Sequence, residues 1–345
     1  MIPGPFLLYL GHSDDEVGIK TSRGLATFRR ADCVGEWRHD DCPLTLGLPR
    51  MDAATARAAG ARTLVLGIAN AGGRLGEALV QDALQAIAQG MNVASGLHQR
   101  LRDDPRLADA AAAAGVQLFD VRDPAAELPV GNGKRRAGNR LLTVGTDCSV
   151  GKMYATLTLR DALHRRGVTA DFRATGQTGI LIAGEGVPLD AVIADFISGA
   201  IETLTPARDD DGWDLIEGQG SLFHPSFAGV STGLLHGAQP AAIVMCHDPS
   251  RAHMRGLPHY RLPDLAECLA ANLQVARLTS PGVRAIGVAL NTVKMDEDAA
   301  RRLCATTGDA LGLPCTDPYR FGADPIADEL LKCFAPSTPA TSASA

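Results

Sequence analysis

A glycine-rich segment between two apolar stretches constrains the fold of this chain more than any other feature. It reads Gly-Thr-Asp-Cys-Ser-Val-Gly-Lys-Met over residues 145–153 and follows the apolar run 141–144. Apolar residues then recur at helical spacing, at Ala155, Leu159, Ala162 and Leu163. A strand, a glycine-rich turn and a helix in this order predict a phosphate-binding loop, because backbone N–H groups and the helix N-terminus face an anion while the lysine adds positive charge.

This loop departs from the common phosphate-binding pattern in two ways. It has one residue more than G-x-x-x-x-G-K-[ST], and Met153 stands where a Ser or Thr would ligate Mg²⁺. The loop is therefore suited to a phosphorylated ligand and poorly equipped for Mg-ATP hydrolysis. We expect no metal to be required, although Asp147 or Glu217 could hold one. The expected cofactor-binding residues are Gly145, Thr146, Cys148, Ser149, Val150, Gly151, Lys152 and Met153.

Length and composition limit the kind of protein. The chain has 345 residues, enough for two domains, and 46% of them are hydrophobic. A net charge of −6 gives no electrostatic reason to expect nucleic acid or an anionic membrane as partner. No apolar run approaches the roughly 20 residues of a membrane span, and the start lacks the basic region of a signal peptide. Eight cysteines without a C-x-x-C pair indicate reduced thiols, so we expect a cytoplasmic protein.

Strand-like and helix-like segments alternate along both halves, which predicts an α/β protein with parallel sheets. We expect an N-terminal Rossmann-like domain over 1–136, a C-terminal P-loop-type α/β domain over 137–335 and a disordered tail over 336–345. The boundary is placed at the polar, basic, glycine-rich stretch 129–138. Candidate strands are 6–10, 63–68, 118–121, 141–144, 169–173, 191–196, 214–216, 241–246 and 283–290, and 90–96 could be a short strand and turn.

Polar motifs follow several of these strands, where ligands of open α/β sheets gather. Glu217 comes directly after the apolar pair 215–216, where partial desolvation favours proton uptake, so we expect it to be the general base. His224 on the same loop is the alternative base. Asp147 sits among loop amides that keep it ionised, which suits a positioning group, or it only hydrogen-bonds the turn. Cys148 could be a nucleophile, but a small loop residue is the simpler interpretation.

The loop resembles that of dethiobiotin synthetase and related amidoligases, which read Gly-Thr-Asp-x-x-Val-Gly-Lys-Thr; only Met153 departs from it. Nearly the whole chain resembles the DgcN-type family, in which a Rossmann-like domain precedes a P-loop-type domain. That resemblance rests on Lys20-Thr21, on 145–153, on Arg173-Ala-Thr-Gly-Gln-Thr-Gly and on Glu217-Gly-Gln-Gly-Ser-Leu with His224-Pro225. The substrate-binding candidates in and around these motifs are Lys20, Arg173, Thr175, Gln177, Gln219, Arg251 and Arg255.

The resemblance implies an N-acetyltransferase that uses acetyl-CoA to acetylate a small-molecule substrate, D-glutamate. Acetyl-CoA carries phosphates but its chemistry needs no Mg²⁺, which agrees with Met153 in place of the hydroxyl residue. Arginines such as Arg173, Arg251 and Arg255 would hold the substrate carboxylates, unless they pair with structural acids. Two alternatives remain: an ATP-dependent enzyme of the dethiobiotin-synthetase type and a non-catalytic nucleotide-binding protein. A homo-oligomer is expected, as is common for such enzymes.

Overall fold

The computed structural model describes residues 2–16, 18–68, 71–124 and 127–335. Contacts between Cα atoms divide the chain into two compact units. The first unit comprises residues 1–128 and 174–193, and the second comprises 129–173 and 194–345. The predicted boundary at 136/137 stays a prediction. Contacts place 129–136 with the second unit and return 174–193 to the first. The tail predicted over 336–345 lies outside the described residues.

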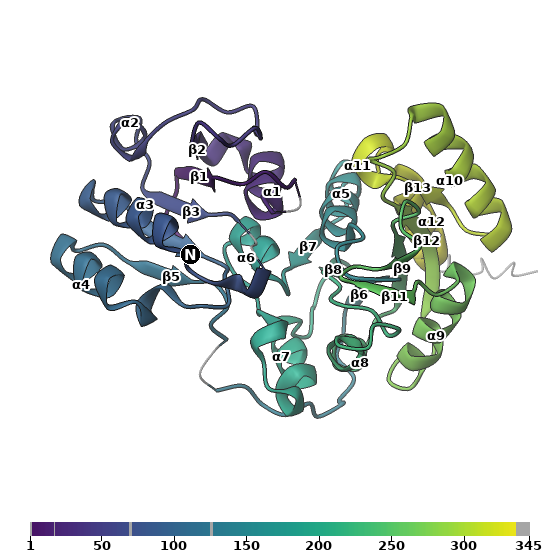
Figure 1. The fold of residues 1–345 in the computed structure, drawn as a ribbon. Coiled ribbons are helices and arrows are strands. Elements are labelled where there is room, and N and C mark those ends of the chain that lie inside the picture. The colour runs from purple at the N-terminus through teal and green to yellow at the C-terminus, as the bar shows by residue number, and fades with distance from the viewer. Residues whose placement is uncertain (1, 17, 69–70, 125–126, 336–345) are drawn as a thin grey trace, which may run out of the picture. The chain divides into compact units, whose positions relative to one another are not determined.

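The first unit is a parallel five-stranded sheet with helices packed around it (Figure 1). Across the sheet the strands are β2 (Cys33–Arg38), β1 (Phe6–Gly11), β3 (Thr63–Leu66), β4 (Asn92–Ser95) and β5 (Leu118–Asp120). The helices are α1 (Lys20–Phe28), α2 (Ala53–Ala58), α3 (Glu77–Ala88), α4 (Pro105–Ala114) and α6 (Gln177–Ala183). Thr21 on α1 and Thr178 on α6 join through their hydroxyls at 2.8 Å, so the returning segment is tied to this unit.

The second unit holds a six-stranded parallel sheet. Across it the strands are β13 (Cys315–Thr316), β12 (Arg284–Leu290), β9 (Ala242–His247), β6 (Asn139–Gly145), β8 (Trp213–Ile216) and β7 (Ala170–Arg173). An antiparallel pair, β10 (His253–Met254) and β11 (Leu257–Arg261), follows β9. The helices are α5 (Lys152–His164), α7 (Ile197–Leu204), α8 (Ala228–Ala238), α9 (Leu265–Arg277), α10 (Glu297–Leu311), α11 (Pro318–Phe321) and α12 (Asp324–Phe334).

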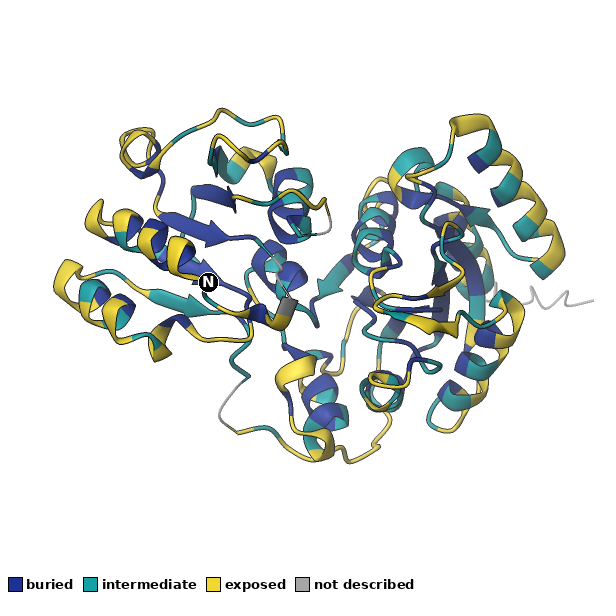
Figure 2. Cartoon of the chain, in the orientation of Figure 1, coloured by how far each residue is buried: buried dark blue, intermediate teal, exposed yellow. Residues whose placement is uncertain are grey.

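Both sheets are buried along most of their strands, as Figure 2 shows in dark blue. Strand β6 lies between β8 and β9 in the middle of its sheet, and Leu141 and Leu142 in it are almost completely buried. Strands covered on both faces need continuous apolar runs, which is why 141–144 could be recognised from the sequence. Among the described residues no helix combines the length and apolar character needed to cross a membrane.

The predicted α/β class with parallel sheets is confirmed, whereas one expected strand is wrong and β2, β10, β11 and β13 were not expected. The strand expected over 191–196 is wrong: two short 3₁₀ helices occupy this region, Leu189–Ala191 and Ala194–Phe196. Val192 in this segment is buried, but the next residue, Ile193, is 69% exposed. The segment is therefore not covered on both faces, as a strand inside a parallel sheet would be. Strand β2 was missed because its sequence, Cys-Val-Gly-Glu-Trp-Arg, mixes charged and apolar residues.

Candidate active site

The glycine-rich loop joins the central strand β6 to helix α5, so the predicted order of strand, loop and helix is confirmed. Thr146 anchors the start of the loop, because its backbone N–H donates to the oxygen of Cys246 on β9 at 3.1 Å. Two residues take left-handed backbone angles, Ser149 with φ of 53° and Gly151 with φ of 99°. Gly151 immediately precedes the first residue of α5, which suits a residue without a Cβ. The N-terminus of α5 therefore lies at the loop, which is the arrangement that binds anions in other proteins.

Lys152 lies inside this loop and is only 7% exposed. Its Nζ donates to the main-chain oxygens of Asp147 at 2.8 Å and Gly220 at 2.9 Å. A lysine ammonium has three N–H donors, so one more remains for an anionic ligand. Burial lowers the pKa of Lys152, and the nearby charges of groups such as Asp147 and Glu217 oppose that shift. Burial thus disfavours the positive charge of Lys152 on balance, and a bound anion would stabilise it.

Asp147 is completely buried and its carboxylate is used within the protein. Oδ1 accepts from the N–H of Cys148 at 2.6 Å. Oδ2 accepts from Nη1 of Arg251 and from the backbone N–H of Arg255, both at 2.8 Å. These bonds tie the loop to the segment that follows β9, and the positioning role of Asp147 stays a prediction.

The two arginines after β9 differ in what their side chains do. Arg251 holds the loop, since Nη2 donates to the oxygens of Cys148 and Ser149 and Nε donates to Asp248 at 3.0 Å. The side chain of Arg255 is exposed, and its Nη1 donates to the hydroxyl of Ser149 at 2.8 Å. Arg255 is the better placed of the two to reach a ligand. A substrate-binding role stays a prediction for both.

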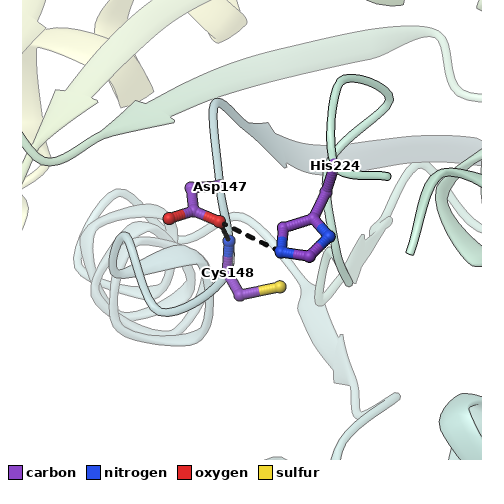
Figure 3. Close-up of side chains that lie close together, drawn as sticks. All are labelled: Asp147, Cys148 and His224. Carbon is purple, nitrogen blue, oxygen red and sulfur yellow. Dashed lines mark hydrogen bonds and ion pairs between the residues drawn. The ribbon is translucent and has the colours of Figure 1, made fainter. Parts of the chain in front are cut away.

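His224 faces the loop from the segment between β8 and α8 (Figure 3). One ligand-type atom from each of Asp147, Cys148 and His224 lies within 4.8 Å of the others. His224 is 3% exposed, and its Nε2 lies 3.9 Å from Oδ1 of Asp147. Its Nδ1 accepts from the backbone N–H of Ser226 at 3.1 Å. In the part of the chain that the structure describes, Nε2 has no hydrogen-bond partner.

The residues after β8 lie next to Lys152. Glu217 is 6% exposed, and its charge is one of those that act on Lys152. Gly218 packs against the loop strand, where its N–H donates to Oγ1 of Thr143 at 3.0 Å. The oxygen of Gln219 accepts from the hydroxyl of Ser231 at 2.8 Å. The base role of Glu217 and the substrate role of Gln219 stay predictions.

Arg173 ends β7 within a charged network. Its Nε donates to Asp214 at 2.8 Å, and Asp214 also accepts from Arg208 at 3.0 Å. Asp214 is completely buried, so Arg173 and Arg208 together neutralise a buried carboxylate on strand β8. These contacts are those expected if Arg173 pairs with a structural acid, which was the alternative interpretation of this residue. Its substrate-binding role stays a prediction.

The other three substrate candidates belong to the first unit. Lys20 and Gln177 are the first residues of α1 and α6, and Thr175, which precedes α6 in the sequence, is completely buried. The main-chain oxygen of Thr175 accepts from the N–H of Leu189 at 3.1 Å. Their predicted role is untested.

Sequence reasoning missed two parts of the loop's support. The oxygen of Gly220 accepts from Lys152, and a main-chain acceptor leaves no signal in the sequence. Asp248 orients Arg251, and the Asp-x-x-Arg spacing directly after β9 was the available signal. Behind the loop, a cavity of about 10 Å³ is lined by residues that include Thr143, Ser221 and Asn272. It has room for one water at most and does not fit an amino acid.

Comparison with known proteins agrees with this geometry. Residues 31–124 match the DUF1611 N-terminal Rossmann-like domain, and residues 129–327 match the DUF1611 C-terminal P-loop domain. The chain is 48% identical over 330 residues to a D-glutamate N-acetyltransferase of Tritonibacter scottomollicae, covering 96% of this chain and 99% of the relative. A D-glutamate N-acetyltransferase of a Pseudoalteromonas species is 45% identical over 329 residues, covering 95% and 99%.

A solved structure is also similar. The crystal structure of a DUF1611 family protein from Anabaena variabilis matches with a TM-score of 0.87 and 33% identity, covering 96% of this chain and all of that one. Together, the two matched domains and the relatives of nearly equal length show that this chain belongs to the DUF1611 family, with a Rossmann-like N-terminal and a P-loop C-terminal domain.

Proposed function

We propose that this chain is a D-glutamate N-acetyltransferase, which transfers the acetyl group of acetyl-CoA to the amino group of D-glutamate and releases CoA. The observation that carries the proposal is similarity at 45–48% identity, over nearly the whole length of both chains, to two proteins of that name. All eight cysteines are free thiols, which suits an enzyme of the reducing cytoplasm. A homo-oligomer is part of the same proposal.

The residues of the loop fit the phosphates of acetyl-CoA. Lys152 offers a third N–H, Arg255 has an exposed guanidinium beside Ser149, and α5 begins at the loop. Met153 offers no hydroxyl for Mg²⁺, and CoA chemistry needs none. Bound acetyl-CoA would supply an activated thioester, and the loop would hold its phosphate end.

This placement has a consequence for the base. The thioester of acetyl-CoA is separated from its phosphates by the long pantetheine arm. If the phosphates bind at the loop, the length of the pantetheine arm separates the reacting carbonyl from Lys152. The same length separates it from Glu217, because the charge of Glu217 acts on Lys152. Glu217 acts as the base only if the thioester, rather than the phosphates, lies at the loop. Its base role stays a prediction, which the variant Glu217→Gln tests.

The rest of the reaction sets requirements for the substrate site. The amine of D-glutamate must lose a proton before it attacks the thioester, and its two carboxylates need cationic or amide partners. Lys20, Thr175, Gln177 and the arginines remain the proposed partners. The product amide carries no charge on nitrogen, which favours its release from a site made for an amine.

One assay tests the proposal. The protein is incubated with acetyl-CoA and D-glutamate, without ATP or Mg²⁺, and free thiol is followed. We expect turnover, with L-glutamate as the chirality control and Lys152→Met as the matched loop variant. Turnover that requires Mg-ATP would instead support a dethiobiotin-synthetase-like activity, and binding of CoA or nucleotide without turnover would support a non-catalytic role.

A further inference from the structure

One buried hydrogen-bond donor at the loop has no acceptor within the described residues. His224 is 3% exposed, and its Nδ1 accepts from the N–H of Ser226 at 3.1 Å. Its ring packs on Phe227 with centroids 4.5 Å apart, which holds the ring plane. Nε2 points to the side of the loop where Asp147 and Cys148 lie (Figure 3).

The bond from Ser226 determines which nitrogen of His224 carries the proton. An Nδ1 that accepts a hydrogen bond uses its lone pair, so the proton of the neutral ring is on Nε2. Nε2 is then a donor. To act there as a base or as a metal ligand, His224 would have to move its proton to Nδ1, where it would face the N–H of Ser226.

The protein atoms near Nε2 do not serve as its acceptor. Oδ1 of Asp147 is 3.9 Å away, beyond hydrogen-bond distance, and already accepts from Cys148. Oδ2 of Asp147 is occupied by Arg251 and the N–H of Arg255. Buried donors in proteins almost always have a partner, and an acceptor atom of a bound ligand would supply it here.

The surroundings of Nε2 define the chemistry of that ligand. The loop before α5, the ammonium of Lys152 and the guanidinium of Arg255 all favour an anion. A phosphate has several acceptor oxygens, so it accepts from backbone, lysine and imidazole donors at once. We propose that His224 is a phosphate-binding residue, whose Nε2–H donates to a phosphate oxygen of the CoA moiety held by the loop. The identity of the ligand as CoA rests on the proposed function.

The test compares two acyl donors and two variants. His224→Leu removes the donor, whereas His224→Gln places an amide N–H near the position of Nε2. Acetyl-CoA carries the phosphates, and S-acetylpantetheine has the same thioester without them. We expect His224→Leu to raise KM for acetyl-CoA by about 10- to 100-fold, as loss of a hydrogen bond to a charged group does. The penalty should largely disappear with S-acetylpantetheine, and His224→Gln should recover most of the affinity for acetyl-CoA.

Calorimetric binding of CoA measures the same loss without turnover. If wild type binds CoA in a His224-dependent way but does not acetylate D-glutamate, the proposed function fails and the phosphate assignment stands. If wild type acetylates D-glutamate and His224→Leu binds CoA as wild type does, the phosphate assignment fails alone. Equal penalties with both donors would place His224 at the thioester, and zinc bound by wild type but lost in His224→Leu would make it a metal ligand; either outcome overturns the proposal.

A measurement on the wild-type protein covers the case in which His224→Leu does not fold. Spectra of the ¹⁵N-labelled histidines, assigned with His224→Gln, report the tautomer of His224. We expect a proton on Nε2 and a shift of that resonance when CoA is added. A proton on Nδ1, or no response to CoA, contradicts the proposal.

Discussion

Arg251 and Asp147, 104 residues apart in the sequence, form a buried ion pair with 2.8 Å between Nη1 and Oδ2. The Asp147 side chain is completely buried and that of Arg251 is 17% exposed. Arg251 also donates to two main-chain oxygens of the loop. The segment after β9 therefore fixes the conformation of the loop before any ligand binds, which reduces the ordering that binding requires.

Arg251→Met should destabilise the protein by about 3 kcal/mol, because it leaves the carboxylate of Asp147 buried without its cation. Urea unfolding measures the change. In the double variant Arg251→Met/Asp147→Asn the uncompensated charge is gone, and we expect part of the stability to return. Additive losses in the two single variants would show that the pair does not couple.

If the loop holds acetyl-CoA as proposed, Lys152 should make its binding dependent on pH. Burial lowers the pKa of Lys152, so its ammonium is lost at a lower pH than that of an exposed lysine. Affinity for acetyl-CoA should therefore fall as pH rises through this lowered pKa. Over the interval between that pKa and the ordinary one, the unfolded chain binds more protons, so stability should rise with pH.

The control for this pH profile is Lys152→Arg, which keeps its charge throughout the alkaline range. Its affinity for CoA should not fall in that range, although its geometry differs. Lys152→Met should bind acetyl-CoA about 10- to 150-fold more weakly at neutral pH, as expected for a charge-assisted hydrogen bond. Wild-type KM for acetyl-CoA that is constant to the end of the lysine range would contradict this role.

Met153→Thr restores the hydroxyl residue of common phosphate-binding loops. Because acetyl transfer needs no Mg²⁺, we expect this variant to keep most of its acetyl transfer and to gain Mg-nucleotide binding at most. Rates with EDTA and with added Mg²⁺ measure this for both proteins. Wild-type acetyl transfer that EDTA abolishes would count against CoA as the ligand of the loop.

Glu217→Gln separates the two roles open to Glu217. The charge of Glu217 raises the pKa of Lys152 against the effect of burial, so its loss should weaken acetyl-CoA binding and shift the alkaline fall in affinity to lower pH. If this electrostatic support of Lys152 is the role of Glu217, turnover of S-acetylpantetheine should change little. If Glu217 were the base, kcat would fall by about 10²- to 10⁴-fold with both donors.

Gly218→Ala tests the close packing beside the loop strand. A Cβ at Gly218 would lie 1.7 Å from the main-chain oxygen of Thr143, so the backbone would have to move. We expect a loss of at least about 1–3 kcal/mol in the free energy of unfolding. Gly229→Ala on α8 is the matched control, because nothing lies within 4 Å of its Cβ, and it should gain about 0.5–1 kcal/mol.

Local sequence patterns were sufficient for the loop and for the central strands, and insufficient for β2. The run 141–144 is apolar on both faces, and the glycines and lysine that follow it form a local motif. In β2, by contrast, Glu36 is completely buried, and its carboxylate accepts from Leu46 N–H, the Thr45 hydroxyl and Arg38. Two of these partners, Thr45 and Leu46, come from the segment after β2 and make it possible to bury Glu36. Because of this buried charge, the sequence of β2 lacks the apolar pattern by which strands are recognised.

The sequence by itself determined the α/β class, the position of the phosphate-binding loop and the residue types it offers, because all three depend on neighbours within a few residues. Only the tertiary structure decided what those residues do. Asp147 turns inward to Arg251, Lys152 reaches the oxygen of Gly220, and Nε2 of His224 is left as a donor. Each depends on partners from segments 68 to 104 residues away or on the tautomer that a backbone N–H imposes, and folding alone brings these groups together.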